Sequence, residues 1–375
     1  MAVSVNSSCT VLAVGVIALA SARVAAQRVP TITLKPADAR LAEEFTRLAA
    51  VRELEDGRVI LADGRDLRLM VADFRAGRVE QISRTGSGPN EYKALSQLWP
   101  IGRDSTLVPD ANNRRWLFLV GARAAGTTPP DAPAVRTASG GLYGADQAGH
   151  VLVTNYDRRG SQDPTAGYGD SLLLLRVERS SGHADTIARL RPINAQMFIT
   201  RDRAGQPTSV DVRLPPWAAG EQALMFEDGW IAVARLDPYR VEWRSADGRA
   251  VRGAALPFTP IRADDREKRA YMSGYASVTA RPVRDPNTRD DWPATLPPFT
   301  RDALLASSDG RLLVRRPRTA ASNATQYDVV DRRGVLVLQL TMPVNEFIVG
   351  FGAKSAYVVV TDDDGIQRIE RHSWP

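Results

Sequence analysis

The chain has 375 residues, of which 43% are hydrophobic, and it carries a formal net charge of +6 with a pI near 9.6. This length and hydrophobic content suffice for a buried core. The single cysteine, Cys9, excludes an intramolecular disulfide and a zinc site built from cysteines. The basic residues are almost all arginines, and they are spread along the chain beside Asp and Glu instead of forming a stripe. We therefore expect no nucleic-acid partner.

The N-terminal segment reads as a secretory signal. Val11–Ala20 is almost purely apolar, and small residues then lead to a cleavage pattern that ends at Ala26. The apolar run is too short to cross a bilayer as a helix, so no transmembrane segment is expected. We predict a signal at residues 1–26, a mature domain over residues 27–375, and a periplasmic or extracellular location. No Lys or Arg precedes the run, and the alternative is a buried N-terminal helix.

Cys9 also bears on anchoring. A bacterial lipoprotein carries its cysteine directly after the apolar run, whereas Cys9 precedes that run. We expect no lipid anchor, and a mature chain without a thiol.

Short apolar runs with turn residues between them recur along the chain. An Asp-Gly pair allows the positive φ of a tight hairpin turn, and an apolar strand is expected to follow it. Three such units are Asp56-Gly57 before Val59–Ala62, Asp228-Gly229 before Trp230–Val233, and Asp309-Gly310 before Leu312–Val314.

A second hairpin follows in two of these repeats, and it ends near a proline in both. The first runs through Tyr239–Trp243, Asp247-Gly248 and Val251–Pro257, and the second through Tyr327–Val330, Arg333-Gly334 and Val335–Leu340. Near the N-terminus, Asp63 and Asp110 precede similar strands 47 residues apart, which is the length of one propeller blade. A rival register pairs Asp73 with Asp110 at 37 residues, but it leaves no room for a fourth strand.

These repeats predict an all-β fold, a six-bladed β-propeller with four-stranded antiparallel blades. The sixth blade has only three C-terminal strands, so we expect the N-terminal strand Thr31–Lys35 to close the ring by pairing with Ile366–Arg371. The alternatives are a β-sandwich or two small β domains. The predicted blades are Leu48–Ile82, Gln97–Arg136, Gly141–Leu190, Ala223–Pro257, Ala303–Met342 and Phe347–Trp374.

The segment Arg84–Tyr92 reads Arg-Thr-Gly-Ser-Gly-Pro-Asn-Glu-Tyr. It resembles the secreted bacterial six-bladed β-propeller proteins related to NHL-repeat propellers, which carry Gly-x-Gly-Pro-Gly-Glu-[Phe/Tyr] after an outer strand. Asn90 replaces the expected glycine, and Asn tolerates the left-handed region, so the turn should survive. The resemblance also covers the Asp-Gly strands, Leu296–Phe299, Val349–Gly352 and Tyr357–Val360. It implies the fold more strongly than any activity, because most of these proteins have no assigned function.

No motif in the sequence identifies a reaction. The three histidines, His150, His183 and His372, lie beside turns or at strand ends, and we interpret them as solvated or capping residues. Asp362–Gly365 superficially suggests calcium, but it lacks the ligand alternation of an EF-hand, and a hairpin turn explains it. Asp264 and Asp265 open a polar, helical stretch. The sequence therefore predicts no cofactor and assigns no catalytic residue.

Loop position says more about function than any motif. In a four-stranded meander, the connection between the second and third strands emerges on the same face as the connection to the next blade. Long connections of these two kinds crowd one face over blades three to five, and they cover residues 157–169, 191–221, 259–301 and 315–325. Long loops gathered on a rigid scaffold are where function usually lies.

The sequence thus predicts a monomeric binding scaffold whose unknown ligand or protein partner docks on this face. The candidate binding residues are Trp217, Tyr275, Trp292, Arg315 and Arg316, with either arginine meeting an anionic group. The alternative for each tryptophan is that it anchors its own loop. The alternative function is a propeller-type hydrolase, lactonase-like, or a lyase, with calcium or another divalent metal in the central channel.

Overall fold

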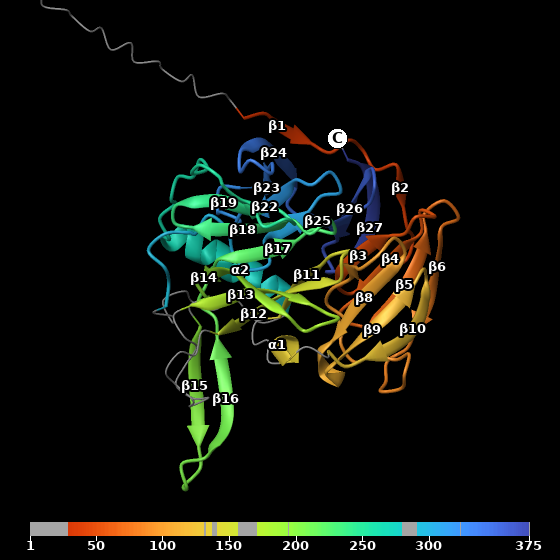
Figure 1. Ribbon diagram of the computed structural model, residues 1–375. Helices are drawn as coiled ribbons and strands as arrows, with labels where there is room; N and C mark the ends of the chain where they lie inside the picture. The colour runs from red at the N-terminus through yellow and green to blue at the C-terminus, as the bar shows by residue number, and fades with distance from the viewer. Residues whose placement is uncertain are drawn as a thin grey trace, which may run out of the picture.

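The computed structural model describes residues 29–130, 133–136, 141–156, 171–193, 195–279, 291–322 and 324–374. Six small antiparallel sheets stand around a common centre (Figure 1). The chain is a six-bladed β-propeller with four-stranded blades, as its repeats predict. The predicted signal at residues 1–26 and the predicted loop at 157–169 lie outside the described residues.

The first three blades follow the order of the chain. Blade one contains β3 (Leu48–Glu53), β4 (Val59–Asp63), β5 (Arg68–Asp73) and β6 (Arg78–Ser83). Blade two contains β7 (Trp99–Pro100), β8 (Ser105–Asp110), β9 (Arg115–Val120) and β10 (Arg123–Thr128), with the short helix η1 (Ala111–Asn113) between β8 and β9. Blade three contains β11 (Leu142–Ala145), β12 (His150–Tyr156), β13 (Leu172–Glu178) and β14 (Ala184–Leu190). Blade two was expected to reach Arg136, but its last strand ends at Thr128 and the short helix α1 (Pro133–Arg136) follows.

The other three blades complete the ring. Blade four contains β17 (Gln222–Met225), β18 (Ile231–Leu236), β19 (Tyr239–Arg244) and β20 (Ala250–Arg252). Blade five contains β21 (Leu304–Ala306), β22 (Leu312–Arg315), β23 (Ala324–Val330) and β24 (Leu336–Pro343). Blade six contains β25 (Glu346–Phe351), β26 (Ser355–Thr361), β27 (Gln367–Ser373) and the N-terminal β2 (Ala39–Arg40).

The Asp-Gly turns adopt the predicted conformation. Gly57, Gly229 and Gly310 have φ angles of 82°, 81° and 81°, in the left-handed region that glycine enters without steric cost. In Asp362–Gly365, the Asp362 carboxylate accepts hydrogen bonds from the backbone N–H groups of Asp364 and Ile366. This run is a hairpin turn, as the sequence indicates.

The ring closes with a different strand from the one predicted. The predicted strand begins as β1 (Thr31–Thr33), which pairs in parallel with β24 as a fifth strand of blade five. It is β2, a few residues later, that pairs with β27, with Ala39 opposite Arg371. Arg40 forms an ion pair with the buried Glu370, and Asp38 with Arg371 at 2.7 Å. These charges fix the register of a strand too short to be recognised from its β propensity.

One of the three histidines, His372, is buried and so does not have the solvated role that we predicted. His372 is only 6% exposed, and its Nδ1 lies 2.8 Å from the carbonyl oxygen of Lys35. Its Nε2 lies 3.2 Å from Glu370, so this side chain links the N-terminal segment to the C-terminal strand. His150 and His183 both belong to blade three, beside Asp146 and Asp185 respectively.

The innermost strands of successive blades pack against one another around the centre. Gly144 of β11 approaches Met225 of β17 so closely that a Cβ atom at Gly144 would lie 2.5 Å from the Met225 Cβ. On β7, the half-buried Trp99 packs against the hydrophobic cluster of blades two and three and also against that of blades four and five. Its indole therefore occupies part of the ring centre.

The segment Arg84–Tyr92 forms the connection from blade one to blade two. The buried Tyr92 donates its hydroxyl hydrogen to the Leu67 carbonyl at 2.9 Å, and the Glu91 carboxylate accepts the Gly88 N–H at 2.7 Å. Arg115 of blade two donates to three carbonyl groups of the segment. The motif thus holds two blades together. The turn survives with Asn90, which does not adopt the left-handed conformation.

Candidate functional site

Three aromatic side chains from two blade-to-blade connections meet on one face of the propeller. Trp217 lies in the connection from blade three to blade four, and Tyr271 and Trp292 lie in the connection from blade four to blade five. The ring centroid of Trp217 is 5.0 Å from that of Tyr271 and 5.3 Å from that of Trp292. The Tyr271 and Trp292 centroids are 5.7 Å apart, with the rings edge to face. Such geometries are favourable for aromatic pairs.

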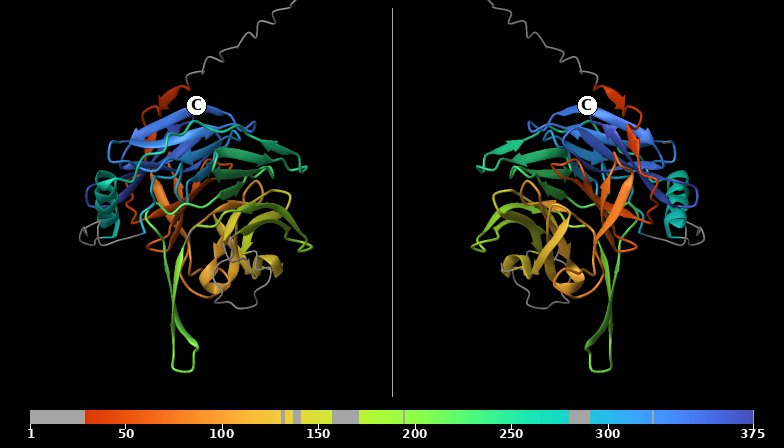
Figure 2. Two further views of the ribbon diagram at one scale, coloured as in Figure 1. Left: turned by 90° about the vertical axis from the view of Figure 1, so that its left-hand side faces the viewer. Right: turned by 90° about the vertical axis from the view of Figure 1, so that its right-hand side faces the viewer.

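The helix α2 (Asp265–Thr279) positions Tyr271. The Asp264 carboxylate caps its first turn by accepting the N–H groups of Arg266 and Glu267, both at 3.0 Å. The buried Glu267 in turn accepts the N–H of Ala320, from the long loop of blade five, at 2.8 Å. Three of the four long connections therefore meet, as the loop argument predicts, and Figure 2 shows α2 at the edge of the propeller body.

Trp217 has an unusual backbone. Its φ angle is +49°, in the left-handed region that a bulky residue rarely enters. Such a conformation costs of order 1–3 kcal/mol, and surrounding structure must hold it. The side chain is 7% exposed and packs with Ala263 and Leu296, while the Ala218 carbonyl accepts the N–H of Arg301. The packing of the indole therefore offsets a strained backbone.

A cavity of about 370 Å³ opens beside this cluster, and we call it the aromatic cavity. Its volume is that of a small-molecule site. Its walls are mainly proline and tryptophan, which are rigid and offer few hydrogen-bond donors. The polar side chains in its lining are those of Asp291 and Thr295. The lining residues are Pro215, Pro216, Trp217, Ala219, Asp291, Trp292, Pro293, Thr295 and Pro297.

The structure brings Trp217 and Trp292 together at the aromatic cavity but places Arg316 elsewhere. The guanidinium of Arg316 contacts the rings of Tyr239 and Phe258, at 5.4 and 4.9 Å from their centroids, and forms an ion pair with Asp328 at 3.2 Å. Asp328 is buried, and it also accepts hydrogen bonds from the Tyr239 hydroxyl and the Gln339 amide, both at 2.9 Å. Burial, and then the charge of Asp328, raise the pKa of Tyr239. Arg316 thus joins blades four and five.

The other two candidate residues are Arg315 and Tyr275. Arg315 is half-buried and donates from Nη2 to the Asp302 carbonyl at 3.3 Å. Tyr275 lies within α2, and its side chain lies outside the described residues. Arg315 does not line the aromatic cavity.

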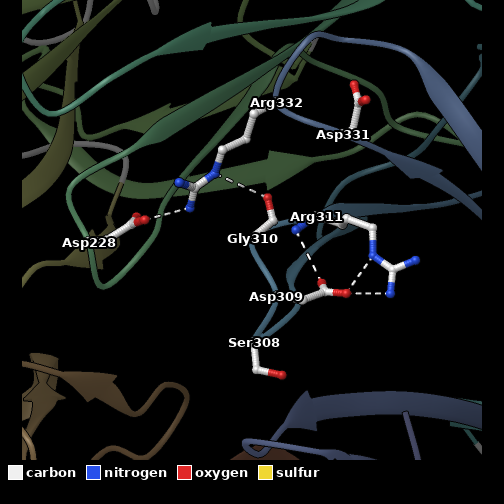
Figure 3. A pocket seen from close by; sticks show the side chains of 7 residues that line it. All are labelled: Asp228, Ser308, Asp309, Gly310, Arg311, Asp331 and Arg332. Atoms are coloured by element: carbon white, nitrogen blue, oxygen red, sulfur yellow. Dashed lines mark hydrogen bonds and ion pairs between the residues drawn. The ribbon is translucent and has the colours of Figure 1, made fainter. Parts of the chain in front are cut away.

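A second cavity, of about 360 Å³, lies between the hairpin turns of blades four and five (Figure 3). It is lined mainly by charged side chains that pair with one another: Arg332 with Asp228 at 2.6 Å, and Arg311 with Asp309. Arg332 also stacks over Trp230, 4.7 Å from the ring centroid. These contacts give the cavity a structural role, because its charges are already engaged within the protein.

No protein-family model matches the chain, and no curated protein matches it by sequence. Solved structures match it in three dimensions. A member of the DUF4221 family from Bacteroides vulgatus is 9% identical, with 90% of this chain and 97% of that chain covered and a TM-score of 0.46. Virginiamycin B lyase from Staphylococcus aureus, solved in a catalytically inactive form with quinupristin, is 12% identical, with coverages of 92% and 98% and a TM-score of 0.41. A calcium-binding protein, regucalcin, from Agrobacterium tumefaciens is 11% identical, with coverages of 92% and 97% and a TM-score of 0.39. The likeness is one of fold alone.

Two further observations concern metals and membranes. Within the residues that the structure describes, no three His, Cys, Asp or Glu side chains converge so that they could hold a metal ion. In the same part of the chain, no helix is both long and apolar enough to cross a membrane.

The sequence reasoning missed the walls of the aromatic cavity and an additional hairpin. The prolines at 215, 216, 293 and 297 were visible next to the two tryptophans, and their clustering was the available signal. The hairpin consists of β15 (Gln196–Arg201) and β16 (Pro207–Arg213), inserted after blade three. Its signal was the turn pattern Asp202-x-x-Gly205 between two alternating runs.

Proposed function

We propose that the protein is an exported, monomeric binding scaffold, and that an apolar ring of its ligand or protein partner docks in the aromatic cavity against Trp217 and Trp292. Aromatic side chains bury a large area at low entropic cost, which makes them frequent anchors of binding. The prolines of the lining support this proposal, since walls that are already rigid lose little freedom when a ligand binds.

The observation that carries the proposal is the strained backbone of Trp217 beside a cavity of ligand size. Strained residues concentrate at binding and catalytic sites, where the geometry that they impose is useful.

An anionic group of the ligand remains part of the proposal, with Arg315 or Arg316 as its partner. Such a group would have to compete with Asp328 for the guanidinium of Arg316. Tyr275 is kept as a candidate on the strength of its place in α2.

Soaking crystals of the protein with indole tests the site. Indole presents a flat apolar ring, and we expect it in the aromatic cavity, in contact with Trp292. Indole bound only at the second cavity beside Trp230, or not bound at all, would contradict the proposal.

Two measurements address the rest of the proposal. The mass of the protein recovered from the periplasm or medium should correspond to a chain that begins at Gln27, and a full-length cytoplasmic product would contradict export. Stoichiometric calcium or zinc in the purified protein would favour the alternative, a hydrolase or lyase with a metal in the central channel.

A further inference from the structure

The hairpin of β15 and β16, which we call the arm (Gln196–Arg213), is the one sheet of the described chain that belongs to no blade. Figures 1 and 2 show it extending away from the propeller body in every view. Its two strands pair with each other over their whole length, from Gln196 opposite Arg213 to Arg201 opposite Pro207. Within the described residues, the outer edge of each strand pairs with no other strand.

A two-stranded hairpin alone in water is marginally stable at best, so the arm needs local support. Hydrogen bonds within its turn supply part of this support. The Asp202 carboxylate accepts the N–H groups of Ala204 and Gln206 at 2.9 and 2.8 Å, and Gly205 adopts a φ of +80°. Arg201 donates to the Gly205 carbonyl at 3.0 Å. The arm is therefore an ordered ribbon with free strand edges, which is a template for a further strand.

The exposed side chains of the arm include an apolar ring and several cations. Phe198 is 44% exposed, and the guanidinium of Arg213 lies 4.4 Å from its ring centroid. The arm itself has three arginines and two aspartates, a net charge of +1, and two further arginines, Arg189 and Arg191, precede it. One of the two aspartates, Asp202, is engaged in the turn. Two copies of the arm would bring like charges together, whereas an acidic segment would be attracted.

We propose that the arm docks an acidic, extended segment of a partner protein, which adds to a free edge of the ribbon as a third strand. Backbone hydrogen bonds of strand addition supply affinity, and side chains on alternate positions supply selectivity. The arginines attract the segment, and Phe198 offers it an apolar contact. β16 ends at Arg213, shortly before Pro215, so the base of the arm lies next to the aromatic cavity. The proposal goes beyond the proposed function and does not depend on it.

Fluorescence anisotropy with labelled ten-residue peptides tests the proposal on the full chain. The probe alternates Glu and Val, so it is acidic and forms an extended strand. One control peptide replaces each Glu with Lys, and a second carries a central proline that interrupts strand pairing. We expect the Glu peptide to bind, the Lys peptide not to bind, and the proline peptide to bind at least tenfold more weakly. Equal binding of all three peptides, or no binding of the Glu peptide, would overturn the proposal.

Protein variants then locate the binding. Replacement of Arg203 and Arg213 by Gln, which leaves the turn contact of Arg201 in place, should weaken binding of the Glu peptide at least tenfold. Replacement of residues 197–212 by a short Gly-Ser linker should abolish it. The point substitutions change exposed side chains, so we expect these variants to fold. They therefore test the proposal even if the linker variant does not fold. Trp292→Ala, which alters the aromatic cavity, should leave peptide binding unchanged. Binding that persists without the arm, or a dimer of the wild-type chain that the linker variant abolishes, would overturn the proposal.

Discussion

The indole of Trp217 lies against the indole of Trp292, with their ring centroids 5.3 Å apart, although they belong to different blade-to-blade connections. Both rings line the aromatic cavity, but they differ in burial: Trp217 is buried and Trp292 is half-buried. Trp217 therefore supports the cluster from below, whereas Trp292 keeps part of its surface exposed, with the ammonium group of Lys268 5.9 Å from its ring centroid.

This difference predicts that substitutions at the two positions separate stability from binding. Trp217→Ala should lower the free energy of unfolding by about 3–5 kcal/mol, because it removes a large buried side chain. Trp292→Ala should cost clearly less. Urea denaturation of the two variants measures this, and equal losses would contradict the assignment of roles.

The left-handed backbone at Trp217 gives a second, sharper expectation. Glycine adopts a positive φ without a steric penalty, whereas alanine does not. Trp217→Gly should therefore be more stable than Trp217→Ala by about 0.5–1 kcal/mol, the reverse of the usual order within a folded chain. Urea denaturation provides the comparison, and the usual order would show that the backbone relaxes on loss of the indole.

Ring closure by β2 predicts the outcome of two N-terminal truncations. A chain that starts at Lys35 loses β1 but keeps β2, the Arg40–Glu370 ion pair and the contact of Lys35 with His372. A chain that starts at Glu43 loses all of these and also the fully buried side chain of Leu41, whose loss alone costs about 2–5 kcal/mol. Thermal unfolding should show a much larger decrease for the second chain. Similar melting temperatures for the two truncations would place the closure in β1.

The contact between Gly144 and Met225 predicts a strongly position-dependent effect of alanine. Gly144→Ala should destabilise the protein by about 1–3 kcal/mol, since the new methyl group would overlap Met225 where blades three and four meet. Gly126→Ala is the matched control, because Gly126 has a positive φ (+122°) like Gly144 (+148°), but a Cβ atom there meets nothing within 4 Å. Chemical denaturation of both variants gives the comparison, and a neutral Gly144→Ala would show that the two blades can separate.

The Arg84–Tyr92 segment predicts a contribution to acid sensitivity. The N–H of Gly88, and then the guanidinium of Arg84, lower the pKa of the Glu91 carboxyl below its ordinary value. Stability from a lowered pKa is fully present above the unfolded-state pKa and is lost as the pH falls through the folded-state pKa. Glu91→Gln should therefore flatten the loss of stability below about pH 4, and Glu80→Gln on exposed β6 is the control. Parallel pH profiles for wild type and Glu91→Gln would contradict this.

The architecture was largely predictable from the sequence because propeller blades repeat local signals. Asp-Gly turns and alternating runs mark hairpins that form between neighbouring residues, and six such units imply a ring. The closing strand was not predictable in the same way. Thr31–Thr33 has the stronger β propensity, but the position of β2 depends on long-range ion pairs with Glu370 and Arg371.

The candidate site was predictable only in part, for a related reason. The positions of the long connections predicted that Trp217 and Trp292 share one face. In the structure the two indole rings are in contact. The role of Arg316 depends on its ion pair with Asp328, which is buried inside blade five. No local sequence pattern predicts that ion pair. Sequence patterns thus predicted that the two tryptophans lie together, while the packing of individual side chains determined the contacts that each candidate residue makes.

The most direct test of the account is a titration of the protein with indole, followed by saturation-transfer NMR. Trp292→Ala removes the accessible ring of the aromatic cavity, and Trp230→Ala removes a half-buried indole beside the second cavity. We expect Trp292→Ala to weaken indole binding at least tenfold and Trp230→Ala to leave it unchanged. Binding that is unaffected by Trp292→Ala, or lost with Trp230→Ala, would contradict a ligand site at Trp217 and Trp292.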